Sequence, residues 1–286
     1  MDQKPDVQYG VELPPHVHSG IRKNRLMLKL FLCMCVPAAA AVGAMGTDAL
    51  FHILLAIGTV VGLHGVLVGV ERLTGKPSLD PSPGSPLVAG MIVGLSMPIA
   101  APYYATVAVA GVTMVGFKWL QGKLLGRKYL NPAASAKLAV LLALTLAVGL
   151  RTGLLFHPHH LDLDFWTAGG LSDALARMYA GQPGLAPAQS LLLWKDHGWI
   201  GGASGVAVLA AGLTAVVWLK LKWRIVLSLL GIVAVLAIAA AFLTGGSVLD
   251  RVAFHLFTGS VIFMGFFMAT EPQSTPLTDG GQLAFG

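Results

Sequence analysis

The chain has 286 residues, of which 55% are hydrophobic and only 11% are charged, and its mean hydropathy is +0.74. A soluble domain carries roughly 25% charged residues, so these proportions exclude a soluble globular protein and indicate one polytopic membrane domain. The net charge of +6 does not indicate nucleic acid, because the basic residues cluster at the ends of apolar segments. Basic residues at the ends of apolar segments indicate which side of the membrane each connection lies on. The lipid bilayer is the expected environment, and no nucleic-acid partner is expected.

About eight apolar segments are long enough, or nearly so, to cross a bilayer core, which takes about 20 residues per helix. In chain order they cover residues 28–47, 49–70, 86–98, 102–120, 133–150, 200–219, 225–243 and 251–270. The third segment is short, because PLVAGMIVGLSMP is followed by the break IAAPYY. The expected fold class is therefore an all-α polytopic membrane protein.

The basic residues divide unequally between alternate connections. Fourteen of the nineteen lysines and arginines lie in the N-terminal tail or in the second, fourth and sixth connections. Four others lie in the remaining connections, and Lys137 lies inside a span. Cytoplasmic connections carry the excess of positive charge. We therefore expect the tail, residues 1–27, in the cytoplasm and the 151–199 loop on the periplasmic side of a bacterial inner membrane.

Two apolar runs that contain glycine, GMIVGLSMP and GFFMATEP, each end at a proline. Proline has no N–H, so Pro98 leaves the Gly94 carbonyl without its helical partner, and Pro272 does the same to Met268. In transporters, paired interrupted helices in corresponding halves point to a central ion site. The alternative is that each proline merely ends a helix, and the two interpretations remain open.

Glu271 lies near the end of the second run, close to the freed Met268 carbonyl. It is therefore the best single candidate for an ion-coupling carboxylate. The alternative is that Glu271 is a surface carboxylate at a helix end. The ion path predicted from the two breaks comprises Gly94, Pro98, Met268, Thr270 and Glu271. Lys137 is costly to place within a span. It could face an anionic group or extend its side chain to the membrane surface.

Histidines occur in two settings. The loop 151–199 contains HPHHLDLD, whose weak candidate metal ligands are His157, His159 and His160. Adjacent histidines rarely both reach one tetrahedral ion, so no metal site is expected, and a solvated loop that docks a partner is favoured. Three further histidines lie inside spans, namely His52, His64 and His255. An ionisable group there is a functional candidate by default, with a neutral histidine hydrogen-bonded between helices as the alternative.

Four stretches of the sequence, taken together, carry a resemblance. They are PHVHSGIRKNRLMLKLFLCMCVPAA, SPLVAGMIVGLSMPIAAPYY with GKLLGRKYLNPAA, GWIGGASGVAVLAAGLTAVVWLKLKWRI, and FHLFTGSVIFMGFFMATEPQSTPLTDGGQLAFG. In this order, and over nearly the whole chain, they resemble the membrane subunit family that includes RnfD and NqrB. The last stretch is the most specific, because it is similar to the family's Phe-Met-Ala-Thr-Asp-Pro-x-Thr-Ser-Pro ending.

The resemblance implies a membrane subunit of a redox-driven pump that passes electrons between ferredoxin or NADH and NAD or quinone while moving sodium ions or protons. It also implies an inverted repeat, with five helices over residues 28–150 and an incomplete second repeat over 200–286 that lacks the family's last two helices. The expected partners are other membrane and electron-transfer subunits, namely ferredoxin-like, flavoprotein or cytochrome subunits. The alternatives are a stand-alone ion or solute transporter and a structural membrane anchor for a periplasmic electron-transfer partner.

Members of this family carry FMN joined through phosphate to a threonine in the loop after span five, in the pattern Asp-x-x-Ser/Thr-Gly-Ala-Thr/Ser. Here the pattern falls on DFWTAGGL, so that Asp164 and Thr167 match while Gly170 stands at the position of the accepting hydroxyl. A phosphoester needs an oxygen nucleophile, which glycine lacks, and covalent FMN is therefore not expected. The subunit would serve as a scaffold, and a non-covalent FMN or riboflavin is the further expectation, near Asn131, Lys137 and Ser204.

Overall fold

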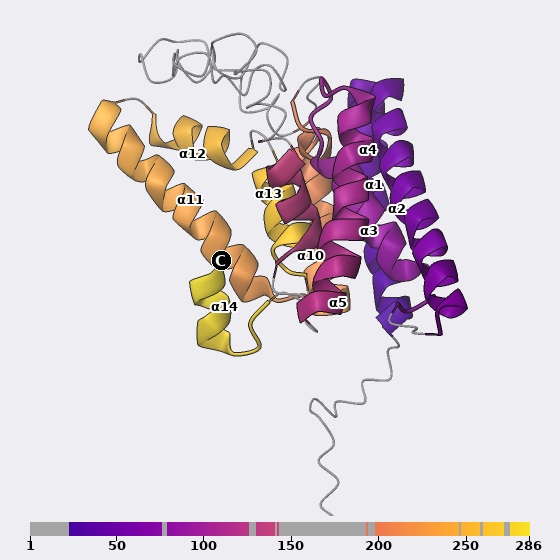
Figure 1. Ribbon diagram of the computed structural model, residues 1–286. Coiled ribbons are helices and arrows are strands. Elements are labelled where there is room, and N and C mark those ends of the chain that lie inside the picture. Colours follow the sequence, from indigo (N-terminus) through magenta and orange to yellow (C-terminus); the bar gives the residue numbers. More distant parts are fainter. Residues whose placement is uncertain are drawn as a thin grey trace, which may run out of the picture.

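A computed structural model describes residues 23–75, 79–125, 130–140, 142, 193, 198–245, 247–257, 260–271 and 275–286. These residues fold almost entirely as helices, and β pairing within them is limited to an isolated bridge between Pro98 and Trp199. The helices form an upright bundle, and α11 and α12 extend to one side of it (Figure 1). The expected all-α fold is confirmed.

Three of the described helices are long and apolar enough to cross a membrane. They are α1 (Lys23–Met45), α2 (Thr47–Leu73) and α11 (Trp223–Thr244). The 23 residues of α1 extend about 34 Å at the helical rise of 1.5 Å per residue, which exceeds the thickness of a hydrocarbon core. Their bounds agree with the first, second and seventh predicted spans to within a few residues, and the polytopic membrane character is confirmed.

Shorter helices supply the rest of the bundle. They are α3 (Gly84–Ser96), α4 (Tyr103–Val112), the π-helix η1 (Thr113–Leu120), α5 (Gln121–Leu125), the 3-10 turn η4 (Ile200–Gly202) and α10 (Gly205–Leu219). α4, η1 and α5 follow one another without a break and together replace the single predicted span 102–120. A further helix covers residues 132–140, at the start of the predicted span 133–150.

The predicted span 251–270 is a bent pair of helices instead of one straight helix. α12 (Val248–Phe257) meets the segment formed by α13 (Val261–Phe263) and the π-helix η5 (Met264–Met268) at 61°. The buried Arg251 guanidinium donates to the carbonyls of Ala240 (3.3 Å) and Gly245 (2.8 Å), at the end of α11. A cation stabilises the negative C-terminal end of a helix. Arg251 therefore holds α12 across the end of α11 and out of line with α13.

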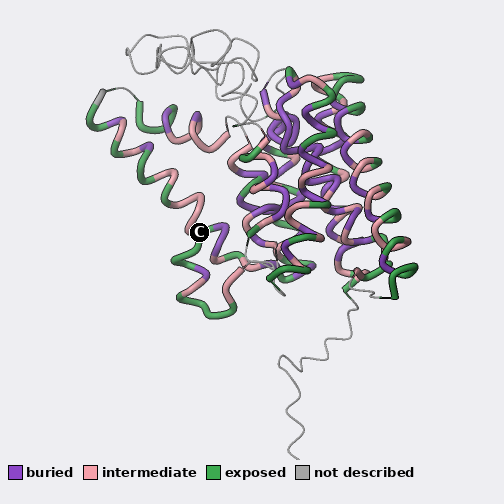
Figure 2. Tube along the Cα trace, in the orientation of Figure 1, coloured by how far each residue is buried: buried purple, intermediate pink, exposed green. Residues whose placement is uncertain are grey.

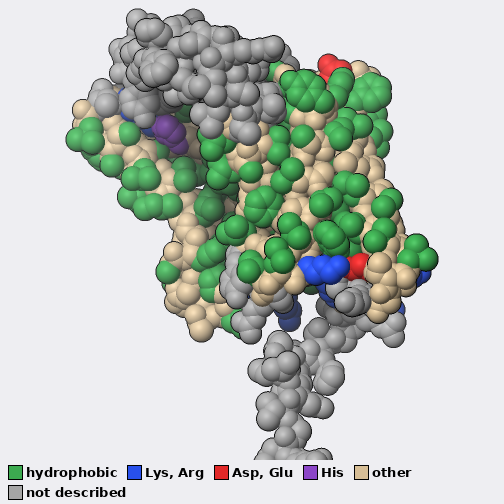
Figure 3. Space-filling model, in the orientation of Figure 1, with side chains coloured by type: hydrophobic (Ala, Val, Ile, Leu, Met, Phe, Trp, Pro, Cys, Tyr) green, Lys and Arg blue, Asp and Glu red, His purple; other side chains and the backbone are tan. Residues whose placement is uncertain are grey.

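The two ends of the bundle differ in their polar residues. The basic end, as we call it, contains the start of α1, the end of α2, α5 and the α10–α11 connection, and lysine and arginine side chains gather there (Figure 3). Three tryptophans at this end each lie within 5.0 Å of a cation: Trp218 with Lys29, Trp119 with Lys123 and Trp223 with Arg224. Tyr103 and Tyr104 are exposed at the opposite end. Aromatic residues at both ends are typical of a bundle that spans two membrane interfaces.

Two glycines of α3 let its backbone approach α2 closely. A Cβ added at Gly90 would lie 2.6 Å from the Cα of Ile57, and one added at Gly94 would lie 2.8 Å from the Cα of Ile53. The spacing Gly-x-x-x-Gly places both on one helix face, as in close helix pairs of membrane proteins. Van der Waals contact between the backbones therefore stabilises the α2–α3 pair.

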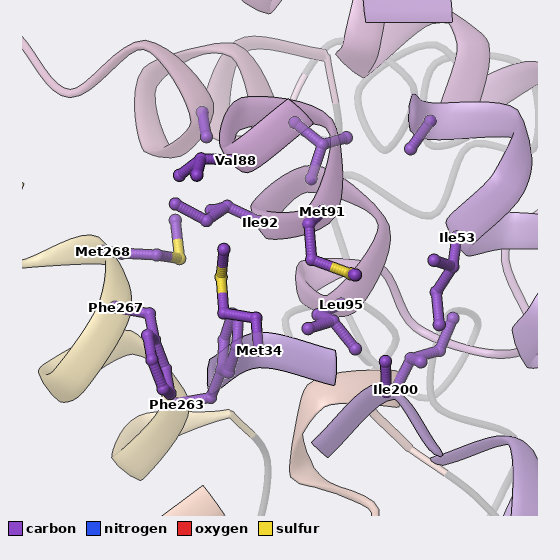
Figure 4. Packing of buried hydrophobic residues seen from close by; sticks show 14 of the residues in the cluster. Met34, Ile53, Val88, Met91, Ile92, Leu95, Ile200, Phe263, Phe267 and Met268 are labelled. Atoms are coloured by element: carbon purple, nitrogen blue, oxygen red, sulfur yellow. The ribbon is translucent and has the colours of Figure 1, made fainter. Parts of the chain in front are cut away.

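Buried residues concentrate where α1, α3, η4 and the α13–η5 segment meet, whereas α11 is mostly half-buried or exposed (Figure 2). Met34 of α1 lies next to the rings of Phe263 and Phe267 (Figure 4), whose centroids are 5.2 Å apart. Ile92 of α3 and Met268 of η5 lie near the same Met34 side chain (Figure 4). This apolar cluster connects the first half of the chain to the last span.

The C-terminal segment is attached to the basic end by polar contacts. The Lys222 ammonium donates to the Thr275 hydroxyl (2.6 Å) and to the Pro276 carbonyl (2.9 Å), and burial lowers the pKa of Lys222. Arg224 pairs at 2.9 Å with Asp279, which is the first residue of α14 (Asp279–Phe285). α14 therefore packs beside the start of α11.

Replacing Gly90 with Ala is expected to destabilise the folded protein by about 1–3 kcal/mol, because the new methyl group must push α3 away from the α2 backbone. The thermal unfolding midpoint in detergent micelles measures this effect. Gly62→Ala on α2 is the matched control, because an added Cβ there meets nothing within 4 Å. Equal midpoints for the two variants would contradict close backbone packing at Gly90.

Candidate functional site

A cleft lies at the basic end, and the space within it and at its open mouth that no atom fills is about 560 Å³. Its walls come from α1, α3, η1, the start of the helix at 132–140, and the end of η5. The lining residues are Met27, Leu30, Ser85, Val88, Ala89, Ile92, Lys118, Asn131, Pro132, Ala133, Phe267, Thr270 and Glu271. Small-molecule sites commonly have mostly apolar walls and a few polar groups, and this lining has the same character. The cleft therefore brings together segments that are distant in the sequence.

Asn131 joins two helix ends at this cleft. Its Oδ1 accepts hydrogen bonds from the backbone N–H groups of Ala133 and Ala134, both at 3.1 Å, and so caps the helix that begins at Pro132. Its Nδ2 donates to the Met268 carbonyl at 2.7 Å. Asparagine at the cap with proline in the first turn is a favoured start for a helix. Both ends of this one amide are therefore used.

The broken end of the last span supplies the other polar groups. The Met268 carbonyl, which the sequence predicts to be freed by Pro272, receives the Asn131 amide, while Pro272 itself lies outside the described residues. The Thr270 hydroxyl donates to the Phe266 carbonyl at 2.5 Å, and Glu271 is half-buried on the cleft wall. Backbone groups at a membrane helix break must be satisfied within the protein, and the Asn131 amide meets that need.

The cleft contains groups of both charges. The Lys118 ammonium donates to the Ser85 hydroxyl at 2.8 Å, and the Glu271 carboxylate lies on the same lining. Carboxylate, hydroxyl and carbonyl oxygens are ligands for hard cations, and an ammonium group can bind carbonyl or anionic oxygens of a ligand. The arrangement can therefore exchange a proton or small cation at Glu271 and bind a polar ring at Lys118.

The connection before α3 is fixed beside the cleft. The Gly84 N–H donates to the Asn24 Oδ1 at 3.0 Å, and Lys23 lies 3.8 Å from Asp80. The N–H of Ser82 holds the pKa of the Asp80 carboxyl below its usual range, and the Lys23 charge acts in the same direction. These contacts hold the start of α1 against the start of α3.

Two other residues predicted to lie near a flavin are placed differently from Asn131. The Lys137 ammonium lies 3.7 Å from the centroid of the Trp199 ring, away from the lining of the cleft. Ser204 is buried and caps α10, with its hydroxyl accepting from the Ala207 N–H at 3.3 Å. The structure therefore places Asn131 on the cleft and Lys137 near the segment that leads to Ser204.

The predicted ion path is divided between the two ends of the bundle. Thr270 and Glu271 lie on the cleft and Met268 beside it, whereas Gly94 packs on α2 and Pro98 lies at the opposite end. There, the Ile99 N–H donates to the Gly198 carbonyl (2.9 Å) and the Ile200 N–H to the Met97 carbonyl (3.0 Å). The two breaks are thus on opposite sides of the apolar cluster.

Several sequence predictions fall outside the described residues. They concern the flavin loop with Asp164, Thr167 and Gly170, and the histidines His157, His159 and His160. Within the described part of the chain, His, Cys, Asp and Glu side chains form no group of three that could hold a metal ion. Lys118 and Ser85 were not predicted from the sequence to be site residues. Lys118 served only as an orientation marker, because no local pattern shows that it points inward.

The comparison with protein families identifies the chain. The model of the NQR2, RnfD, RnfE family matches residues 10–286. The chain belongs to this family. The resemblance inferred from the four stretches of sequence is thereby confirmed, and the cleft described above is a feature of an NQR2/RnfD/RnfE family member.

Three curated relatives show the extent of the similarity. The D subunit of the ion-translocating oxidoreductase complex of Rhodobacter capsulatus is 28% identical over 299 residues, which cover 95% of this chain and 81% of the relative. The protein of the same name from Aeromonas salmonicida is 27% identical, covering 97% and 86%. The D subunit of the proton-translocating ferredoxin:NAD(+) oxidoreductase complex of Clostridium ljungdahlii is 25% identical, covering 97% and 82%.

Substitutions of Asn131 separate its two contacts. Asn131→Ala is expected to lower stability by about 1–3 kcal/mol, because it removes the helix cap and the shorter of the two hydrogen bonds to the Met268 carbonyl, which leaves only the Glu271 N–H at 3.4 Å. Asn131→Asp keeps the capping oxygen but turns a charged acceptor toward the Met268 carbonyl, so its thermal midpoint should also fall below that of the wild type. Thr278→Ala is a control that removes only a cap, that of α14. A wild-type midpoint for Asn131→Asp would show that the bond to Met268 is not stabilising.

Proposed function

We propose that this chain is the D-type membrane subunit of a redox-driven, ion-translocating oxidoreductase complex of the Rnf or Nqr kind. The observation that carries this proposal is the family match over residues 10–286. The relatives in R. capsulatus and C. ljungdahlii bear the names of subunits of such complexes. Its partners in this proposal are other membrane subunits and electron-transfer subunits that are ferredoxin-like, flavoproteins or cytochromes.

The proposal places the basic end on the cytoplasmic side of a bacterial inner membrane and the 151–199 loop in the periplasm. The excess of lysine and arginine at the basic end supports this orientation, because cytoplasmic connections carry such an excess. The tryptophan–cation contacts of Trp119 and Trp218 support an interface at the same level. The cleft then faces the cytoplasmic side, where a soluble electron donor can reach it.

In this proposal Glu271 exchanges the coupling proton or cation with the cytoplasmic side. Three features support it: its half-buried position on the cleft, the neighbouring Thr270, and the broken helix end at Met268. An ionisable group at membrane depth usually marks an ion or proton route. Asn131 positions this site, because it holds the Met268 carbonyl three residues before Glu271.

The proposal includes no covalent FMN and allows a non-covalent FMN or riboflavin in the cleft. The apolar walls formed by Val88, Ile92 and Phe267 suit the face of a planar ring. Lys118 would supply a donor to ring carbonyl oxygens. A bound flavin would carry electrons, while the residues of this chain orient it and exclude water. Without a flavin the subunit acts as a scaffold and ion site.

Affinity purification of the tagged full-length chain from native membranes tests the proposal. We expect electron-transfer subunits to co-purify and the complex to couple electron transfer to ion movement in liposomes. A chain that purifies alone and moves an ion or solute alone would identify a stand-alone transporter. A chain that retains a periplasmic electron carrier, but whose complex moves no ion, would identify a membrane anchor.

Glu271→Gln is expected to lower ion movement by the purified complex about tenfold or more while electron transfer continues, because the amide cannot carry a charge or release a proton. Ion flux into liposomes and the rate of acceptor reduction measure the two activities separately. Asp279→Asn, which removes a surface carboxylate paired with Arg224, should leave both unchanged. Wild-type flux in the Glu271→Gln complex would remove this residue from the ion route.

Gly170→Thr is expected to restore covalent flavin attachment, because it returns a hydroxyl to the position where the family pattern has one. Both chains are expressed in a host that attaches flavin covalently to a member of this family. After denaturing electrophoresis, ultraviolet light should show a fluorescent band for the variant and none for the wild-type chain. Gly169→Thr is the control for a hydroxyl one residue out of register. A fluorescent wild-type band would overturn the proposal that Gly170 prevents attachment.

A further inference from the structure

His52 lies at the opposite end of the bundle from the cleft and is completely buried. Its Nδ1 shares a hydrogen bond of 2.7 Å with the hydroxyl of Thr106 on α4, which is also fully buried. Its Nε2 has no hydrogen-bond partner among the residues that the structure describes. Buried polar atoms are nearly always hydrogen-bonded. Beyond Thr106, the structure compensates this ring with the backbone of Ile99 and Ala101, which interacts with it more weakly than a full hydrogen bond.

A tyrosine and a carboxylate lead from this histidine to the surface. The ring of Tyr103 lies 4.8 Å from the imidazole, centroid to centroid, and its hydroxyl donates to Asp48 Oδ1 at 3.0 Å. Asp48 is exposed in the first turn of α2, and Tyr103 is 44% exposed. Tyr103 therefore lies between the buried imidazole and the surface carboxylate of Asp48.

The site lies against the break between α3 and α4. The backbone of Ile99 and Ala101, within that break, neighbours the imidazole. Non-helical backbone at membrane depth is found where it is buried in protein or lines a functional cavity. Among the described residues, the charged or titratable groups that act on His52 are Asp48 from its own helix and Tyr103 from α4.

These surroundings suit a ring that changes its charge. A proton that binds Nε2 produces an imidazolium whose Nδ1–H donates to the Thr106 oxygen. The Asp48 carboxylate attracts that positive charge, and the face of the Tyr103 ring lies within the range of a cation–π contact. On release, the proton passes from Nε2 to water at Asp48 and the neutral ring returns.

We propose that His52 is the proton-exchange group of this subunit at the end opposite the cleft, with Thr106 and Tyr103 as positioning residues and Asp48 as its surface acceptor. This inference rests on the proposed function, because it assigns the outer step of ion translocation. It requires that the coupling ion be a proton. If His52 only linked α2 to α4, the hydrogen bond of one ring nitrogen to Thr106 would be enough. A glutamine amide could then replace the ring without loss of proton movement.

The test uses the whole purified complex in liposomes, driven by reduced ferredoxin and NAD, with a pH-sensitive dye reporting proton movement. His52→Gln keeps an amide to bond Thr106 but cannot be protonated. We expect proton movement to fall about tenfold or more, while electron transfer by uncoupler-treated liposomes continues. The part of the pH dependence of proton movement that an ionising imidazole produces should disappear.

Asp48→Asn and Tyr103→Phe are needed in case the His52→Gln complex fails to assemble. Both side chains reach the surface, so these two changes should not prevent assembly. Each should slow proton movement several-fold without changing electron transfer. Wild-type proton movement in His52→Gln, or in both surface variants, overturns the inference and leaves the proposed function standing. Sodium movement without proton movement in the wild-type complex has the same result. A wild-type complex that moves no ion overturns the proposed function, and this inference with it.

Discussion

Where a helix breaks inside a bilayer, its free backbone N–H and C=O groups need hydrogen-bond partners from another part of the protein, because lipid offers none. This chain satisfies the requirement at two places. The Met268 carbonyl receives the Asn131 amide, and the segment 97–99 exchanges backbone hydrogen bonds with the segment 198–200. In both cases the partner is distant in the sequence, so each break fixes one half of the chain to the other. The polar groups of the two proposed sites lie beside these two breaks.

The apolar cluster between the breaks limits how an ion could move. Met34, Phe263 and Phe267 are buried side chains without charge, and they lie between the cleft and the segment around Pro98. A close-packed interior of this kind has no room for a hydrated ion. The cleft and His52, the two proposed exchange sites, therefore lie on opposite sides of this cluster. Passage of an ion between them would require a rearrangement, as the proposed pump does and an open channel does not.

Local features of the chain were predictable from its sequence, and contacts across it were not. Hydropathy located α1, α2 and α11 to within a few residues, because span length depends only on nearby side chains. The missing N–H of Pro272 predicted a free carbonyl at Met268, but not that Asn131, 137 residues earlier, would bond to it. Hydropathy also treated 251–270 as one span, because it does not register that Arg251 bonds the end of α11. The cleft depends on such contacts, so only its individual residues could be proposed in advance.

A series of contacts connects the two ends. The helix at 132–140 is held at its start by the bond from Asn131 to Met268, and further along by Lys137 on the Trp199 ring. Trp199 in turn forms the bridge to Pro98, beside the backbone that neighbours His52. Glu271, the proposed exchange site, lies three residues after Met268, whose carbonyl Asn131 holds. A shift of that carbonyl would reach the helix carrying Lys137 through Asn131, because packed elements with discrete contacts can transmit a displacement. The same asparagine that stabilises the break is therefore in a position to couple the two sites.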